Sequence, residues 1–233
     1  MSEQKPRRPA RVALGRGTEP PGELPTWLVE PDLHLYAIAS PFAGSTLAAH
    51  VALEATAASL AASPPVTSTL ERRECAQLRT AIVSAEARWF ERVAADPSLH
   101  GQGATFAAVF LAGGHASVAH LGDCRVHQIR DSQILRKTAD HTAQTSSGRR
   151  ALLRAIGLDS NPHVVSWDAK DEDTFLLTAG VHDLMSEHEL LEVVQTSPDP
   201  AHATARLLEV ASLRGARDYL TALIVRPFAS EVA

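Results

Sequence analysis

Apolar residues recur at helical spacing in two long segments in the first half of the chain. The first runs from Ser45 to about Ala62 and is rich in alanine. The second follows Ser68, which forms a capping-box pattern with Glu71, and closes at Asp96. Its core-facing stripe consists of Leu78, Ile82, Ala85, Trp89 and Val93. These patterns predict two helices that each bury one face.

Other segments are apolar on both alternating faces, which is typical of strands buried on both sides. The clearest are Thr105 to Leu111 and, near the end of the chain, Tyr219 to Val225. Further strands are predicted at 33–39, 115–121, 125–130, 133–137, 164–167 and 174–178. A turn is expected at Ser40–Gly44, and the RALLRAIG segment, Arg150 to Gly157, is expected to be a short helix.

Two more helices are predicted before the last strand. Ser186 and Glu189 form a capping box, and Asp199 is a cap followed by Pro200 at the first helical position. The element order is therefore a strand, two helices, a run of strands, two helices and a strand. Strands buried on both faces, with helices grouped in sequence, predict an α+β fold of two stacked antiparallel sheets flanked by helices.

Composition and charge narrow the class of protein. The 233 residues are 45% hydrophobic and 21% charged, which suits one soluble domain, and the net charge of −5 argues against a nucleic-acid binder. We find no apolar run long enough for a membrane span and no secretory signal, so a cytoplasmic location is expected. Cys75 and Cys124 are too few for a disulfide framework. A disordered basic arm is expected at 1–11, the domain at 12–228 and a tail at 229–233.

Six ordered segments carry a more specific signal. They are Gly103-Ala104-Thr105, VAHLGDCRVHQIRDSQI (Val118 to Ile134), Thr138-Ala139-Asp140-His141-Thr142, LLRAIG (Leu152 to Gly157), FLLTAGVHDLM (Phe175 to Met185) and GARDYLTALIV (Gly215 to Val225). In order and spacing they resemble the metal-dependent protein phosphatase family, the PPM or protein phosphatase 2C type, as a degenerate, bacterial-like member. The resemblance implies a PPM-type α-β-β-α sandwich and hydrolysis of phosphoserine and phosphothreonine on a two-metal Mg or Mn centre.

Most of the positions that the resemblance assigns to the primary metals carry no carboxylate in this sequence. Ser40 stands where the family has its bridging aspartate. Ala179 stands at the second ligand position, or Gly180 if the alignment has no gap, and only Asp218 keeps its carboxylate at the third. Because hard divalent cations need oxygen ligands, the binuclear centre is expected to be absent.

Other acids match secondary positions of the family. Asp123 and Asp183 match residues that help to hold an additional, weaker metal, and Asp140-His141 matches a structural pair. A purely structural interpretation has Asp218 as a turn residue and Asp123 bound to backbone amides, with Arg125 as its ion-pair partner. Zinc at His182 and His188 is disfavoured because residues six apart lie on different helical faces.

These observations lead to a pseudophosphatase hypothesis. The protein would be a PPM-type phosphatase-like protein, catalytically impaired, with no catalytic residues assigned, that binds a phosphoprotein or a protein of a serine/threonine kinase pathway. The alternative is an active but divergent Mg- or Mn-dependent phosphatase built on Asp123, Asp183 and Asp218, with Asp32 or Glu30 as further candidates. A third hypothesis is a structural component of a larger assembly.

Overall fold

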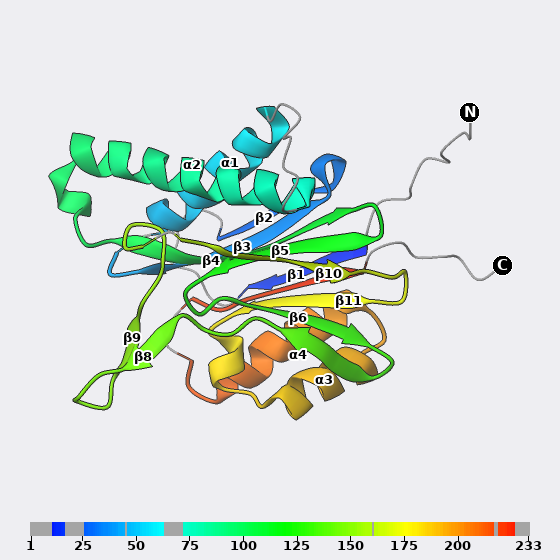
Figure 1. The fold of residues 1–233 in the computed structure, drawn as a ribbon. Helices are drawn as coiled ribbons and strands as arrows, with labels where there is room; N and C mark the ends of the chain where they lie inside the picture. The colour runs from blue at the N-terminus through cyan, green and yellow to red at the C-terminus, as the bar shows by residue number, and fades with distance from the viewer. Residues whose placement is uncertain are drawn as a thin grey trace, which may run out of the picture.

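The computed structural model describes residues 11–16, 26–44, 46–62, 72–159, 161–216 and 219–226. These residues form two five-stranded sheets, ordered β1-β12-β11-β6-β7 and β10-β5-β4-β3-β2, and a two-stranded sheet of β8 and β9 (Figure 1). All the pairings within them are antiparallel. The strands of the first sheet are β1 (Arg11–Arg16), β12 (Thr221–Arg226), β11 (Thr174–Ala179), β6 (Arg125–Arg130) and β7 (Gln133–Lys137). Those of the second are β10 (His163–Asp168), β5 (His115–Leu121), β4 (Gly103–Ala112), β3 (Leu35–Phe42) and β2 (Trp27–Glu30).

Helices cover the outer face of each sheet (Figure 1). Helices α1 (Leu47–Ala62) and α2 (Arg73–Ala95) pack on the second sheet, and α3 (Glu187–Thr196) and α4 (Pro200–Leu213) pack on the first. Short 3-10 helices lie at η1 (Pro31–Leu33), η2 (Pro97–Leu99) and η3 (Val181–Asp183). The predicted α+β sandwich with helices outside is confirmed, as are the caps at Ser186 and Asp199. The Ser68–Glu71 capping box lies outside the described residues, and α2 begins at Arg73.

Three apolar clusters form the core. One lies between α1–α2 and the second sheet, one between the two sheets, and one between the first sheet and α3–α4. Strand β4 shows why both of its faces are apolar. Phe106 and Ala108 pack beneath α1 and α2, whereas Ala107 and Val109 pack between the two sheets. A third cluster fills the space between the first sheet and helices α3 and α4.

The predicted turn at Ser40–Gly44 is wrong at its start, because β3 continues through Phe42. Ser40 pairs with Thr105 and Pro41 with Ala104 on β4. On the other side, β2 pairs with β3 only as far as Ile38. Among the described residues, no strand pairs with β3 on that side at Pro41, so Pro41 can be accommodated although it has no amide hydrogen to donate.

The predicted helix from Arg150 to Gly157 is also wrong. The chain instead forms a hairpin of β8 (Thr142–Gln144) and β9 (Arg150–Leu152), which projects beside the sandwich (Figure 1). Ile156 is fully buried and exchanges two backbone hydrogen bonds with Ala104, of 3.1 and 2.9 Å. Pairing with β4 therefore overrides a short helical pattern. Strand β1 was not predicted, and its first residue, Arg11, lies one position before the expected start of the domain.

One buried histidine makes the stability of the fold depend on pH. His127 on β6 is fully buried. Burial lowers the pKa of His127 from 6.5 to about 4; Arg125 and Lys137 also lower it, and Glu187 opposes them. The unfolded chain therefore binds this proton at a higher pH than the folded chain, and stability falls as the pH drops from about 6.5 towards 4. We expect this group to remove about 2 kcal/mol of unfolding free energy between pH 7 and pH 5.

Urea denaturation at the two pH values tests this expectation. A His127→Leu variant should lose less stability on acidification than the parent, by about 2 kcal/mol. His188→Leu, the same change at an exposed position of α3, should retain the parent's pH dependence. An unchanged pH dependence in His127→Leu would contradict the assignment.

Candidate functional site

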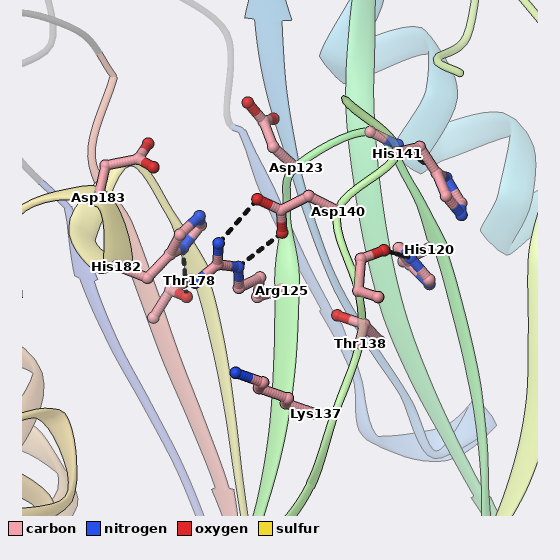
Figure 2. Close-up of polar contacts among 12 residues, drawn as sticks. His120, Asp123, Arg125, Lys137, Thr138, Asp140, His141, Thr178, His182 and Asp183 are labelled. Atoms are coloured by element: carbon pink, nitrogen blue, oxygen red, sulfur yellow. Dashed lines mark hydrogen bonds and ion pairs between the residues drawn. The ribbon is translucent and has the colours of Figure 1, made fainter. Parts of the chain in front are cut away.

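Three aspartates converge beside the β8–β9 hairpin. Asp123 lies in the turn between β5 and β6, Asp140 follows β7, and Asp183 ends η3, after β11. The turn before Asp123 needs Gly122, whose φ is 79° and whose added Cβ would lie 2.3 Å from Thr105 Cγ2. Figure 2 shows the three carboxylates around Arg125 and His182. The structure thus brings together Asp123 and Asp183, which the sequence singles out, with Asp140.

Arg150 on β9 joins these acids through its guanidinium. Its Nη1 and Nη2 donate to the two carboxylate oxygens of Asp183 at 2.8 and 3.1 Å. Nη2 also donates to Asp123 Oδ2 at 3.1 Å, and Nη1 lies 3.7 Å from Asp140 Oδ2. A single side-chain cation is therefore bound between the two acids at which the resemblance implies an additional metal.

Asp140 has a second arginine partner. Arg125 Nε and Nη2 donate to its two oxygens at 2.6 and 2.7 Å (Figure 2). The expected Arg125–Asp123 pair is therefore wrong, and Arg150 takes that place. Burial is the largest single effect and raises the pKa of Asp140. The hydrogen bonds and charge of Arg125, together with the charges of His182 and Arg150, outweigh burial and hold the pKa below its ordinary value. This bidentate pair supports the structural interpretation of the Asp140-His141 motif.

Asp123 is half-buried, and a buried histidine, His182, lies beside the acid cluster. Burial raises the pKa of Asp123 above its ordinary value, and this effect exceeds the opposing attraction of Arg150. His182 is buried beside the cluster, where its Nδ1 lies 2.9 Å from Thr178 Oγ1 (Figure 2). Burial lowers the pKa of His182 to about 4, so its ring is neutral near pH 7. His188 is exposed on α3.

The positions that the resemblance assigns to the primary metals have different surroundings. Ser40 lies on β3, and its carbonyl accepts a hydrogen bond of 3.4 Å from Thr105 Oγ1. Ala179 ends β11 and is only 2% exposed, within the core between the sheets. Gly180, the alternative, has a φ of 70° and forms the turn into η3. Asp218 lies outside the described residues.

The donor chemistry at these positions does not suit a hard divalent cation. Magnesium and manganese prefer several oxygen ligands, of which carboxylates contribute most of the charge. Neither the methyl group of Ala179 nor Gly180 offers a side-chain oxygen, and Ser40 offers a neutral hydroxyl. Within the described residues, the nearby carboxylates of Asp123, Asp140 and Asp183 are already bound by arginines.

A cleft of about 630 Å³ lies elsewhere, over α1 and α2. Its lining includes Leu28, Val51, Glu54, Arg88 and Arg92. None of the cleft's lining residues belongs to the acid cluster, so the cleft is not part of the candidate site. In the part of the chain that the structure describes, no helix is long and apolar enough to cross a membrane.

The sequence and the fold both match known phosphatases. Serine/threonine protein phosphatase PstP of Mycobacterium tuberculosis is 28% identical over 166 residues, which are 64% of this chain and 32% of that protein. The crystal structure of the M. tuberculosis phosphatase PstP/Ppp superposes with a TM-score of 0.78 at 25% identity, covering 95% of this chain and 100% of that one. The chain is therefore similar, in sequence and in fold, to bacterial serine/threonine phosphatases of the PPM type.

Other comparisons agree at the level of the PPM fold. The PPM phosphatase MsPP from Mycobacterium smegmatis, solved with cacodylate, has a TM-score of 0.71 at 26% identity, over 95% of this chain and 99% of that one. PppA of Pseudomonas aeruginosa has a TM-score of 0.77 at 21% identity, over 95% and 99% of the two chains, which shows the fold alone. No protein-family model matches the chain. The chain spans about a third of the length of its M. tuberculosis relative.

Sequence reasoning found two of the acids of this PPM-like site but missed the cation that binds them. Arg150 was placed in a predicted helix, where nothing directed its side chain to Asp123 or Asp183. The available signal was the short segment between His141 and Arg154, which is too short for the family's usual flap and favours a tight hairpin. Such a hairpin returns the chain beside the acids.

Proposed function

We propose that this chain is a PPM-type phosphatase-like protein with impaired catalysis, which acts as a binding or regulatory module for a phosphoprotein or a protein of a serine/threonine kinase pathway. The observation that carries the proposal is the guanidinium of Arg150, bound to Asp123 and Asp183. A cytoplasmic location is part of the same proposal.

The charge balance supports impaired turnover. A related catalytic domain, that of PstP, has been solved with two manganese ions, with a TM-score of 0.77 at 24% identity over 94% of this chain and 98% of that one. Two divalent ions about 4 Å apart repel one another by roughly 16 kcal/mol even at an effective dielectric near 20. Carboxylates at the positions of Ser40 and Ala179 would offset that repulsion, and this chain has none there. A hydrolytic step on two metals therefore lacks its electrostatic support.

The alternative is an active, divergent phosphatase. It is favoured by the proximity of the carboxylates of Asp123, Asp140 and Asp183. In this alternative the three acids release Arg150 and bind a metal cation in its place. Asp218 would complete the ligand set, with Asp32 or Glu30 as more remote candidates. The two functions differ in whether metal supports turnover.

Hydrolysis of a phosphothreonine peptide with millimolar Mn²⁺ or Mg²⁺ separates them. We expect the parent and Asp218→Ala proteins to release phosphate at the same background rate. Turnover in the parent that disappears in Asp218→Ala would establish the divergent enzyme. PstP is a positive control for the peptide and the metal.

Binding is the second half of the test. The same phosphopeptide, labelled with a fluorophore, is titrated with the protein and followed by anisotropy, with the unphosphorylated peptide as the control. Binding that requires the phosphate supports the module. Equal affinity for both peptides, or none for either, would contradict phosphoprotein recognition and favour the structural-component hypothesis.

A further inference from the structure

Three histidines meet at one end of the β5–β10 strand pair, and one of them, His141, directly follows Asp140 of the acid cluster. His120 on β5 is the register partner of His163 on β10. His141 is held beside them because its backbone amide donates to the Gly122 carbonyl at 2.8 Å. One ring nitrogen from each histidine lies within 4.8 Å of those of the other two. Three separate backbone segments therefore present imidazoles to one point.

The ring arrangement is compact. The centroids of His120 and His141 are 4.3 Å apart, and Figure 2 shows these two rings side by side. The centroid of His163 lies 5.3 Å from that of His120 and 6.4 Å from that of His141. His120 is buried, His141 is partly buried and His163 is exposed, so the cluster opens to solvent on the side of His163.

His120 is held in a state that suits a metal ligand. Its Nε2 lies 2.8 Å from the Ala139 carbonyl oxygen, which can only accept, so Nε2 carries the hydrogen and Nδ1 keeps a lone pair. His120 is 1% exposed, and its Nδ1 has no hydrogen-bond partner among the described residues. Metal-bound histidines commonly donate the other ring N–H to a carbonyl in this way, which fixes the tautomer.

Burial favours the neutral form of the His120 and His141 rings. Burial lowers the pKa of His120 to about 4, and burial also lowers the pKa of His141, with Arg154 as the next cause. His141 Nδ1 accepts a long hydrogen bond of 3.3 Å from the Gly122 amide, so this ring also has a lone pair facing a donor. A cation at Nδ1 would replace that weak hydrogen bond.

We propose that His120, His141 and His163 bind a single transition-metal cation of the Zn²⁺ class, with at least one coordination position open to solvent. Three imidazoles suit Zn²⁺, Co²⁺, Ni²⁺ or Cu²⁺, whereas Mg²⁺ and Mn²⁺ prefer oxygen ligands. The ligand chemistry therefore differs from that of a two-metal phosphatase centre, and the proposal does not depend on the proposed function. Zinc–nitrogen bonds of about 2.0–2.1 Å require the rings to draw together, which the exposed His163 side chain permits.

Cobalt titration of the metal-free full chain tests the site. Co²⁺ bound by three histidines at a four- or five-coordinate site gives much stronger visible ligand-field absorption than octahedral aqueous Co²⁺, and Zn²⁺ added afterwards should remove it. We expect one equivalent to bind. His163→Ala should weaken binding on the order of tenfold to hundredfold. Because His163 is exposed, this variant should fold, and circular dichroism checks that it does.

The matched control is His115→Ala, at the opposite end of the same strand pair, where His115 faces Asp168 in the register. It should bind Co²⁺ as the parent does. Absence of binding in the parent would overturn the proposal. So would equal affinity in the parent and His163→Ala, which would place the metal elsewhere, and so would equal weakening by both substitutions.

Discussion

Replacing Asp173 with asparagine is expected to destabilise the fold by about 3 kcal/mol, the low end of the cost of breaking a buried ion pair. Asp173 is fully buried just before β11. Arg130 Nε and Nη2 donate to its two oxygens at 2.5 and 2.8 Å. Gln128 Nε2 and the Lys170 amide also donate to Oδ2, at 2.8 and 2.9 Å.

The pKa of Asp173 is lowered, as expected for a carboxylate that is charged and paired with an arginine. Burial alone would raise it, but the hydrogen bonds from Arg130, Lys170 and Gln128 outweigh burial and hold it below its ordinary value. The carboxylate therefore contributes stability above its unfolded pKa, and that contribution is lost as the pH falls through the lower folded value. An asparagine cannot supply the charge, and it leaves Arg130 without its principal partner.

Thermal unfolding at pH 7 provides the measurement. For a domain of this size about 3 kcal/mol corresponds to roughly 10 °C in Tm. Asp168→Asn is the matched control, because Asp168 lies 3.7 Å from the same arginine but its side chain is 58% exposed. We expect that control to shift Tm by no more than about 2 °C. Equal Tm shifts in both variants would show that the buried Asp173–Arg130 pair contributes no more to stability than the exposed Asp168 side chain.

Removing Arg150 is expected to convert the acid cluster into a cation site. At about 4 Å a guanidinium repels an incoming Mn²⁺ ion by roughly 8 kcal/mol at an effective dielectric near 20, and solvent exposure reduces this to roughly 1–2 kcal/mol. An Arg150→Ala variant should therefore bind Mn²⁺ about tenfold more tightly than the parent. The gain comes from Asp123, Asp140 and Asp183, which lose a shared cation.

Electron paramagnetic resonance of free Mn²⁺ measures this affinity directly. Arg149→Ala is the matched control, since it removes the same charge from the adjacent, exposed residue. We expect the control to bind Mn²⁺ as the parent does. If Arg150→Ala and Arg149→Ala bind Mn²⁺ equally, the guanidinium of Arg150 does not hold the place of a cation.

The layered fold could be predicted from the sequence because its signals are local. Both faces of 105–111 are apolar since β4 lies between a helix layer and a second sheet. The caps at Ser186 and Asp199 are read from residues within one turn of each helix. Motif order then supplied the resemblance to the PPM family, which the fold comparison confirms.

The site could be predicted only in part because its partners are distant along the chain. Asp123 and Asp183 were found from motifs, but Arg150 is 27 and 33 residues away from them and lies on a hairpin expected to be helical. The histidine cluster was also missed. His120, His141 and His163 belong to three segments, and only the β5–β10 register and the return of the chain after β7 bring them together.

The arginine in the acid cluster differs from a metal in one further respect: it is covalently attached. A bound ion exchanges with the medium, so its occupancy follows supply, competing ions and chelators. The guanidinium of Arg150 is present in every molecule whatever the supply of metal, and it remains charged at every physiological pH. The surface formed by the β8–β9 hairpin and the three aspartates should therefore keep the same shape in EDTA as in millimolar Mg²⁺. A partner that docks there would encounter a surface that does not report the metal content of its surroundings.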